Sequence, residues 1–323
     1  MAMEKLTEAA LVVIKDCLGV KRDETVLILT DSPCAIIGKT LFEVSLDFSF
    51  ESFLLEMEPR KLNGEEPPVQ VSNLMKEVDV VVSPLSRSVT HTEARRNACK
   101  KGTRVGTMPG ITEDVMVRTM RADYHQIAKL TNRITEILTA GTIAHLTTPL
   151  GTDIKIPING IKALPSTGLV REKGQFGNLP SGESFLMPEE GKAWGVFYID
   201  ASLAGVGLVK NEPIKITVED GLAVKIEGGG QAKLFEKMVE EVGIQGRNLA
   251  ELGVGTNYLA EIKGNTLEDE KVLGTVHLAL GNNVTMGGTV NVGFHVDGII
   301  TNPTLKIDDI FVLKDGKMLI DGD

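Results

Sequence analysis

The chain has 323 residues, of which 42% are hydrophobic and 24% are charged, as in soluble globular proteins and unlike disordered or fibrous chains. With ~150 residues in a typical domain, this length predicts two domains. Acidic residues outnumber basic residues by 44 to 34, which gives a formal net charge of −10. This excess argues against nucleic acid or an anionic membrane as the main partner, because both attract basic surfaces.

The sequence also indicates the cellular compartment. No apolar run approaches the ~20 residues that a membrane span needs. Residues 1–20 alternate charged and apolar side chains at helical spacing, unlike the basic and then apolar stretches of a secretory signal. Cys17, Cys34 and Cys99 are too few and too scattered for a disulfide framework or a zinc knuckle. We therefore expect a protein of the reducing cytoplasm.

The N-terminal part, residues 1–140, alternates helical and strand patterns, which predicts an α/β domain with a Rossmann-like parallel sheet. A helical stretch over 113–140 is expected to bridge to the second half. No phosphate-binding glycine motif follows any of these strands, so nucleotide binding is not supported. The expected helices cover 7–18, 33–46 and 93–101, with a short one before residue 79, and the expected strands cover 25–30, 52–58, 79–83 and 103–107.

The pattern changes after Gly141 to short β-type segments separated by glycine-rich turns. One amphipathic helix, over 231–242, interrupts them. We therefore expect residues 141–323 to form an α+β, strand-rich domain. Its predicted strands cover 142–147, 153–158, 193–200, 214–219 and 222–227.

The second half carries acidic and imidazole side chains in segments otherwise poor in charge. They are Glu183 in Asn-Leu-Pro-Ser-Gly-Glu, Glu251 in Ala-Glu-Leu-Gly, Glu270 in Leu-Glu-Asp-Glu-Lys, His277 in Gly-Thr-Val-His-Leu-Ala-Leu-Gly, and His295 and Asp297 in His-Val-Asp. Because residues two apart on a strand project from the same face, His295 and Asp297 form a typical half-site for a divalent ion. An ionised Glu251 in an apolar segment needs a compensating cation or donor.

Structural roles also fit these residues taken singly. His277 fits a hydrogen-bonded core histidine, and small Thr275 and Ala279 on the same face leave room for an approaching group. Glu251 fits an ion pair with a lysine, and Glu183 fits the cap of a turn. On composition alone, Glu268 and Glu270 fit solvated loop charges. The order and number of these groups in one half favour a shared metal centre.

In this order, the five motifs resemble the M29 metallo-aminopeptidases, the aminopeptidase T/S or leucyl aminopeptidase-like group. The resemblance implies two divalent ions. A shell of imidazoles and carboxylates suits zinc, cobalt or manganese, and the candidates for the catalytic base are Glu251 and Glu270. The resemblance also implies a homodimer that releases N-terminal residues from small peptides by metal-activated water. The metal ligands it implies are Glu183, Glu251, His277, His295 and Asp297, with Glu270 as a further candidate.

Two other functions remain open. Aminopeptidases of that family place a tyrosine shortly after the histidine of the fourth motif, whereas Val284 stands there in this chain. The 2,5-dihydroxypyridine dioxygenases, relatives by fold, hold one Fe(II) with two histidines and one aspartate, in a pattern with histidine at position 251 and no carboxylate at 183. Glu183 and Glu251 therefore favour the hydrolase. The second of these functions is that of a non-catalytic metal-binding protein, with all metal positions filled by protein atoms.

Overall fold

The computed structural model describes residues 2–322 and divides the chain into two compact units. The first unit comprises Met1–His125 and Gly168–Ser181, and the second comprises Gln126–Thr167 and Gly182–Asp323. The single boundary predicted near residue 140 coincides with the end of a helix inside the second unit. The chain then returns to the first unit at 168–181, a return that no change in composition marks.

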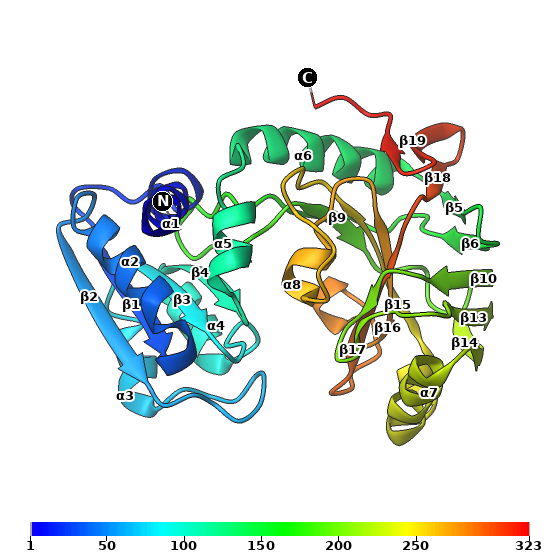
Figure 1. The fold of residues 1–323 in the computed structure, drawn as a ribbon, viewed down its shortest axis with the longest axis horizontal. Coiled ribbons are helices and arrows are strands. Elements are labelled where there is room, and N and C mark those ends of the chain that lie inside the picture. Colours follow the sequence, from blue (N-terminus) through cyan, green and yellow to red (C-terminus); the bar gives the residue numbers. More distant parts are fainter. Residues whose placement is uncertain (1, 323) are drawn as a thin grey trace. The chain divides into compact units, whose positions relative to one another are not determined.

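The first unit is built on a parallel sheet whose strand order is β2-β1-β3-β4-β8 (Figure 1). Strands β1 and β3 are buried almost throughout, as expected for strands covered on both faces. The expected α/β unit with a parallel sheet is confirmed. Its helices are α1 (Ala2–Leu11), α2 (Ala35–Ser45), α3 (Val69–Leu74), α4 (Glu93–Lys101) and α5 (Glu113–Thr119), and its strands are β1 (Thr25–Asp31), β2 (Glu51–Met57), β3 (Val80–Leu85), β4 (Arg104–Pro109) and β8 (Phe176–Asn178).

Two features around the parallel sheet differ from the sequence prediction. The helix expected over 113–140 is two helices, α5 and α6 (Tyr124–Ala140). The break has a local cause, because the Asp123 carboxylate accepts a hydrogen bond from the backbone N–H of His125 at 2.9 Å and starts a new helix. Strand β8 was not predicted, since three residues are too few to show a periodic pattern.

The second unit contains two antiparallel sheets, of eight strands (β14-β13-β10-β6-β5-β18-β19-β20) and seven strands (β12-β11-β17-β16-β15-β9-β7). The expected strand-rich unit is confirmed. Its helices are α6, α7 (Gly230–Val242) and α8 (Thr266–Asp269), and its strands are β5 (Ile143–Thr147), β6 (Asp153–Pro157), β7 (Leu164–Ser166), β9 (Glu183–Leu186), β10 (Trp194–Ile199), β11 (Ser202–Leu203), β12 (Gly207–Leu208), β13 (Ile214–Glu219), β14 (Leu222–Glu227), β15 (Leu249–Gly255), β16 (Val276–Gly281), β17 (His295–Ile300), β18 (Thr304–Ile307), β19 (Ile310–Lys314) and β20 (Lys317–Met318).

The core of the second unit draws on both sheets. Leu252 of β15 and Leu278 of β16 belong to the same buried apolar cluster as Phe197 of β10. The sheets approach so closely at Gly298 that a Cβ there would lie 2.2 Å from the Ile199 side chain. Because side chains alternate along a strand, the residues between these core positions project from the opposite face of the seven-stranded sheet. That face carries the candidate site. Within residues 2–322, no helix is long and apolar enough to cross a membrane.

Candidate metal centre

Four neighbouring strands of the seven-stranded sheet, β9, β15, β16 and β17, carry five of the predicted residues. Glu251 pairs across the sheet with Ala279, which in turn pairs with Asp297, so these three residues form one row. His277 and His295 lie two residues from this row along their strands, on opposite sides of it and on the same face of the sheet. The short side chain of Ala279 leaves space between the two carboxylates of the row.

The compact centre of the site is a triplet formed by Glu251, His295 and Asp297, whose ligand atoms all lie within 4.8 Å of one another. The Nε2 atom of His295 is 3.3 Å from Glu251 Oε2 and 3.4 Å from Asp297 Oδ1. Donor atoms bound at about 2.1 Å to one ion are separated by about 3.0–3.4 Å in octahedral or tetrahedral geometry. The observed separations match this range.

The orientation of His295 is fixed from outside the triplet. Its Nδ1 atom lies 2.7 Å from the carbonyl oxygen of Asn282, which can only accept a hydrogen bond. Nδ1 therefore carries a hydrogen in either charge state, and in the neutral imidazole Nε2 has the lone pair that a metal ion needs. The His295 side chain is 33% exposed, so the triplet is open to solvent at this residue.

His277 and Glu183 extend the triplet inward. The fully buried His277 places its Nε2 atom 3.3 Å from Glu251 Oε1 and 3.6 Å from Glu183 Oε2. Glycine stands at position 253, opposite His277 on β15, and a Cβ there would lie 2.0 Å from His277 Nε2. Gly253 therefore provides the space in which the imidazole lies, a role that the sequence did not reveal.

Several buried polar atoms of the site accept or donate no hydrogen bond among the residues that the structure describes. They are Glu183 Oε2, Asp297 Oδ1 and His277 Nδ1. A buried polar atom without a partner costs about 1–3 kcal/mol, so such atoms indicate a missing ligand when they gather at one place. Carboxylate oxygens and imidazole nitrogens together suit a divalent transition metal. The residues therefore fit a metal ion.

The charges of the site are strongly coupled. Although burial opposes the charged form, the neighbouring His295 lowers the pKa of Asp297 to about 2, and hydrogen bonds with His277 and His295 lower the pKa of Glu251. Burial likewise disfavours the imidazolium of His277, but Glu251 and Glu183 outweigh it and raise its pKa to about 9. The pKa of His295 is raised well above its ordinary value, against burial, mainly by Asp297. In the metal-free protein, protons on His277 and His295 therefore offset part of the negative charge of the neighbouring carboxylates.

Glu270, the sixth predicted ligand, lies beside Lys271 at the edge of this cluster. Its Oε1 atom pairs with the Lys271 ammonium, and its side chain is 15% exposed. Burial, reinforced by Glu183 and opposed by Lys271, raises the pKa of Glu270 to about 8. The adjacent Glu268 is fully buried and accepts a hydrogen bond from the backbone N–H of Glu261 at 2.9 Å. A solvated loop charge is therefore the wrong description of Glu268.

Gly253→Ala is expected to destabilise the protein by about 1–3 kcal/mol, because the added methyl group and the buried His277 ring would occupy the same space. Urea unfolding of the metal-free protein measures this change. Gly230→Ala is the control, since a Cβ at that first position of α7 meets nothing within 4 Å. We expect the control to unfold as the wild type does; equal stability of both variants would contradict the assigned role of Gly253.

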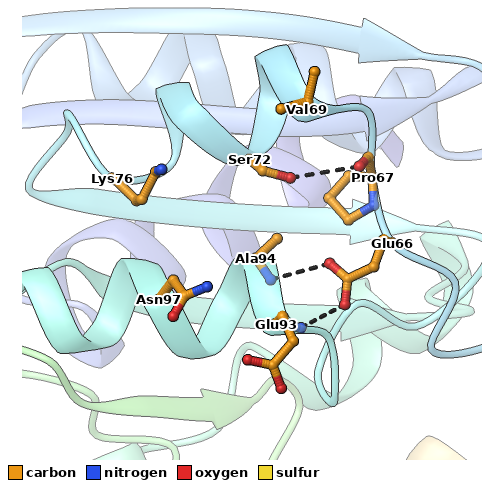
Figure 2. Close-up of a pocket in the computed structure, with 8 residues that line it drawn as sticks. All are labelled: Glu66, Pro67, Val69, Ser72, Lys76, Glu93, Ala94 and Asn97. Atoms are coloured by element: carbon orange, nitrogen blue, oxygen red, sulfur yellow. Dashed lines mark hydrogen bonds between the residues drawn. The ribbon is translucent and has the colours of Figure 1, made fainter.

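The first unit has a surface hollow of about 340 Å³ (Figure 2). It lies between α3 and α4, and its lining includes Glu66, Lys76 and Asn97. The Glu66 carboxylate accepts hydrogen bonds from the backbone N–H groups of Glu93 and Ala94 at 2.5 and 3.0 Å. Glu66 thereby caps the first turn of α4, so we assign this hollow a structural role.

The fold and the acidic–imidazole cluster define a candidate metalloprotein with an α/β unit and a strand-rich unit. A family model described as 2,5-dihydroxypyridine 5,6-dioxygenase (NicX) matches residues 5–320. The chain belongs to this family. The 2,5-dihydroxypyridine 5,6-dioxygenase of Pseudomonas putida KT2440 is 23% identical over 189 residues, which span 54% of this chain and 53% of the relative.

Solved structures show the same fold. A structure of 2,5-dihydroxypyridine dioxygenase from Pseudomonas putida KT2440 superposes with a TM-score of 0.86 and 17% identity, covering 99% of this chain and 98% of that chain. Wild-type AmpT from Thermus thermophilus superposes with a TM-score of 0.73 and 17% identity, covering 98% of this chain and 99% of that chain. At this identity the similarity concerns the fold alone.

The family match corrects the function expected from the sequence. Membership in the M29 aminopeptidases is wrong, and with it the assignment as a hydrolase or metallopeptidase, because the matching model and relative are dioxygenases. The error has a structural reason. Four of the five motifs that suggested it contribute residues to the strands of one sheet, in a fold shared with both the dioxygenase and AmpT. Their order therefore reports the fold and does not distinguish the two reactions.

Proposed function

We propose that this protein is an iron-dependent dioxygenase that opens the ring of 2,5-dihydroxypyridine or a closely related dihydroxylated heterocycle. The observation that carries the proposal is the family match over residues 5–320 in a chain whose second unit brings Glu251, His295 and Asp297 within 4.8 Å of one another. Iron replaces zinc, cobalt or manganese as the proposed metal, and a small-molecule substrate and a homodimer remain predictions.

Glu251, His295 and Asp297 would hold the ion, and ferrous iron, when bound, supplies the redox chemistry that lets dioxygen react with an aromatic ring. The chain's own groups prepare the site. Asn282 orients His295 through its carbonyl oxygen, and the exposed side of His295 admits the substrate. His277 holds a proton at Nε2, between the carboxylates of Glu183 and Glu251.

The donor set differs from the two histidines and one aspartate expected for a ferrous site of this kind. The compact triplet has one histidine and two carboxylates, and the second imidazole, His277, lies next to Glu251. Glu251 thus stands where the expected set has its second histidine. Carboxylate and imidazole ligands both suit Fe(II), so this replacement keeps a suitable donor and adds one negative charge.

Oxygen uptake tests the proposal. The protein is loaded with Fe(II) under nitrogen, separated from free iron and mixed with air-saturated buffer and 2,5-dihydroxypyridine in an oxygen-electrode cell. We expect one molecule of dioxygen to disappear for each heterocycle whose ring absorbance is lost. Metal-free protein is the control and should consume none. No uptake by iron-loaded protein with this compound or other dihydroxypyridines would refute the proposal.

A further inference from the structure

The site contains a buried cation of its own. The Lys271 side chain is only 1% exposed, and its Nζ atom lies 2.6 Å from Glu183 Oε1. The same ammonium pairs with Glu270 Oε1. Lysine is almost never fully buried unless it is paired, and here it engages the two carboxylates at the inner end of the cluster.

The backbone holds Lys271 in this position from both sides. Its N–H donates to the carbonyl oxygen of Glu268 at 2.9 Å, and its own carbonyl oxygen accepts from the N–H of Asn257 at 2.8 Å. Just beyond Lys271, Val272 packs against β15 at Gly255, where a Cβ would lie 2.1 Å from the Val272 carbonyl oxygen. Glycine at 255 therefore permits the close approach that brings the lysine under the sheet. These backbone contacts therefore fix the position of Lys271.

Lys271 continues the alternation of charges across the site. Glu183 contacts Lys271 with Oε1 and faces His277 with Oε2, and His277 in turn contacts Glu251. Glu183 thus lies between Lys271 and His277, and Glu251 lies between His277 and His295, groups that carry or can carry positive charge. A metal ion at the triplet would extend this series at the end opposite Lys271.

We propose that the Lys271 ammonium takes the place of a second metal ion, so that the site binds one divalent ion and not two. This inference rests on the proposed metal site. The Lys271 ammonium already pairs with Glu183 and Glu270, the two carboxylates that a second ion would need, and leaves Glu251 and Asp297 for a single divalent ion at the triplet. A second divalent ion beside this ammonium would bring two cationic groups together among buried side chains, which is energetically costly. It would also compete with Lys271 for Glu183 and Glu270.

Metal counting tests this inference without any substrate. Metal-free protein is dialysed against Mn(II), and bound manganese is measured by elemental analysis and by electron paramagnetic resonance, which distinguishes isolated from exchange-coupled ions. We expect one equivalent of isolated Mn(II) in the wild type and two coupled equivalents in Lys271→Met, where Glu183 and Glu270 are released. Lys271→Arg keeps the positive charge and should bind one equivalent. Lys271→Met/Glu183→Gln should return to one.

Two equivalents in the wild type would overturn the inference, and so would one equivalent in a folded Lys271→Met protein. If Lys271→Met does not fold, Lys271→Gln replaces it, since its amide retains a hydrogen-bond donor toward Glu183. Thermal melting gives a second readout, because added Mn(II) should raise the melting temperature of the lysine variant more than that of the wild type. If the metal counts are as expected but the iron-loaded protein takes up no oxygen, the role of Lys271 stands and the dioxygenase proposal fails.

Discussion

Asp297→Asn is expected to weaken binding of a divalent metal ion at least about 100-fold, since changes even in the groups around the ligands typically cost 10–100-fold. The amide keeps the shape of the side chain but removes the negative charge that lies 3.4 Å from His295 Nε2. It also removes one of the three groups that define the triplet. Titration of metal-free protein with Mn(II), followed by calorimetry, measures the loss.

Asp309→Asn provides the matched control, because it makes the same chemical change at a fully exposed aspartate of the second unit. We expect its metal affinity to equal that of the wild type and the circular dichroism spectra of both variants to be unchanged. Full metal affinity in a folded Asp297→Asn protein would show that Asp297 is not a ligand.

Metal affinity is also expected to rise steeply with pH. In the metal-free protein both imidazoles carry protons at pH 7, because carboxylates hold the pKa of His277 at about 9 and that of His295 well above its ordinary value, despite burial. A metal ion must displace the proton on His295 and disfavours the one on His277, 3.3 Å from Glu251. Release of one to two protons gives about 10- to 100-fold tighter binding per pH unit up to about pH 9.

The same pKa shift predicts the opposite trend for the stability of the metal-free protein. The pKa of His277 is higher in the folded state than in the unfolded state, so its contribution to stability is fully present below about pH 6.5 and is lost as the pH rises through about 9.

The pH dependence of metal affinity is tested by calorimetry. Metal binding in two buffers with different ionisation enthalpies counts the released protons. An affinity that does not change between pH 6 and pH 8 would contradict this description of the site.

The candidate site could be predicted from sequence to the extent that strand geometry determines it. Alternation along one strand was enough to place His295 and Asp297 on the same face. The row formed by Glu251, Ala279 and Asp297 depends on the register of three strands, and nothing in the isolated segments specifies that register. The motifs predicted a common metal centre only through their resemblance to the M29 aminopeptidases, and the chain belongs to a different family.

Other features could not be predicted because they depend on contacts between distant segments. Lys271 follows three acidic residues, a context typical of solvated loops, yet Glu183, 88 residues earlier, binds it in the interior. Gly253 resembles any glycine in a strand until His277 is placed opposite it. In the first unit, β8 joins the sheet only because residues 168–181 return to it. Burial and long-range pairing determine all three, and local periodicity reports neither.

Crystals of the iron-loaded protein, measured on both sides of the iron absorption edge, test the central claim most directly. An anomalous difference map locates iron independently of any assumed ligand. We expect one peak, at about 2.0–2.2 Å from side-chain atoms of Glu251, His295 and Asp297, with Lys271 still paired to Glu183. A peak away from these three residues, or a second peak between Glu183 and Glu270, would contradict the account.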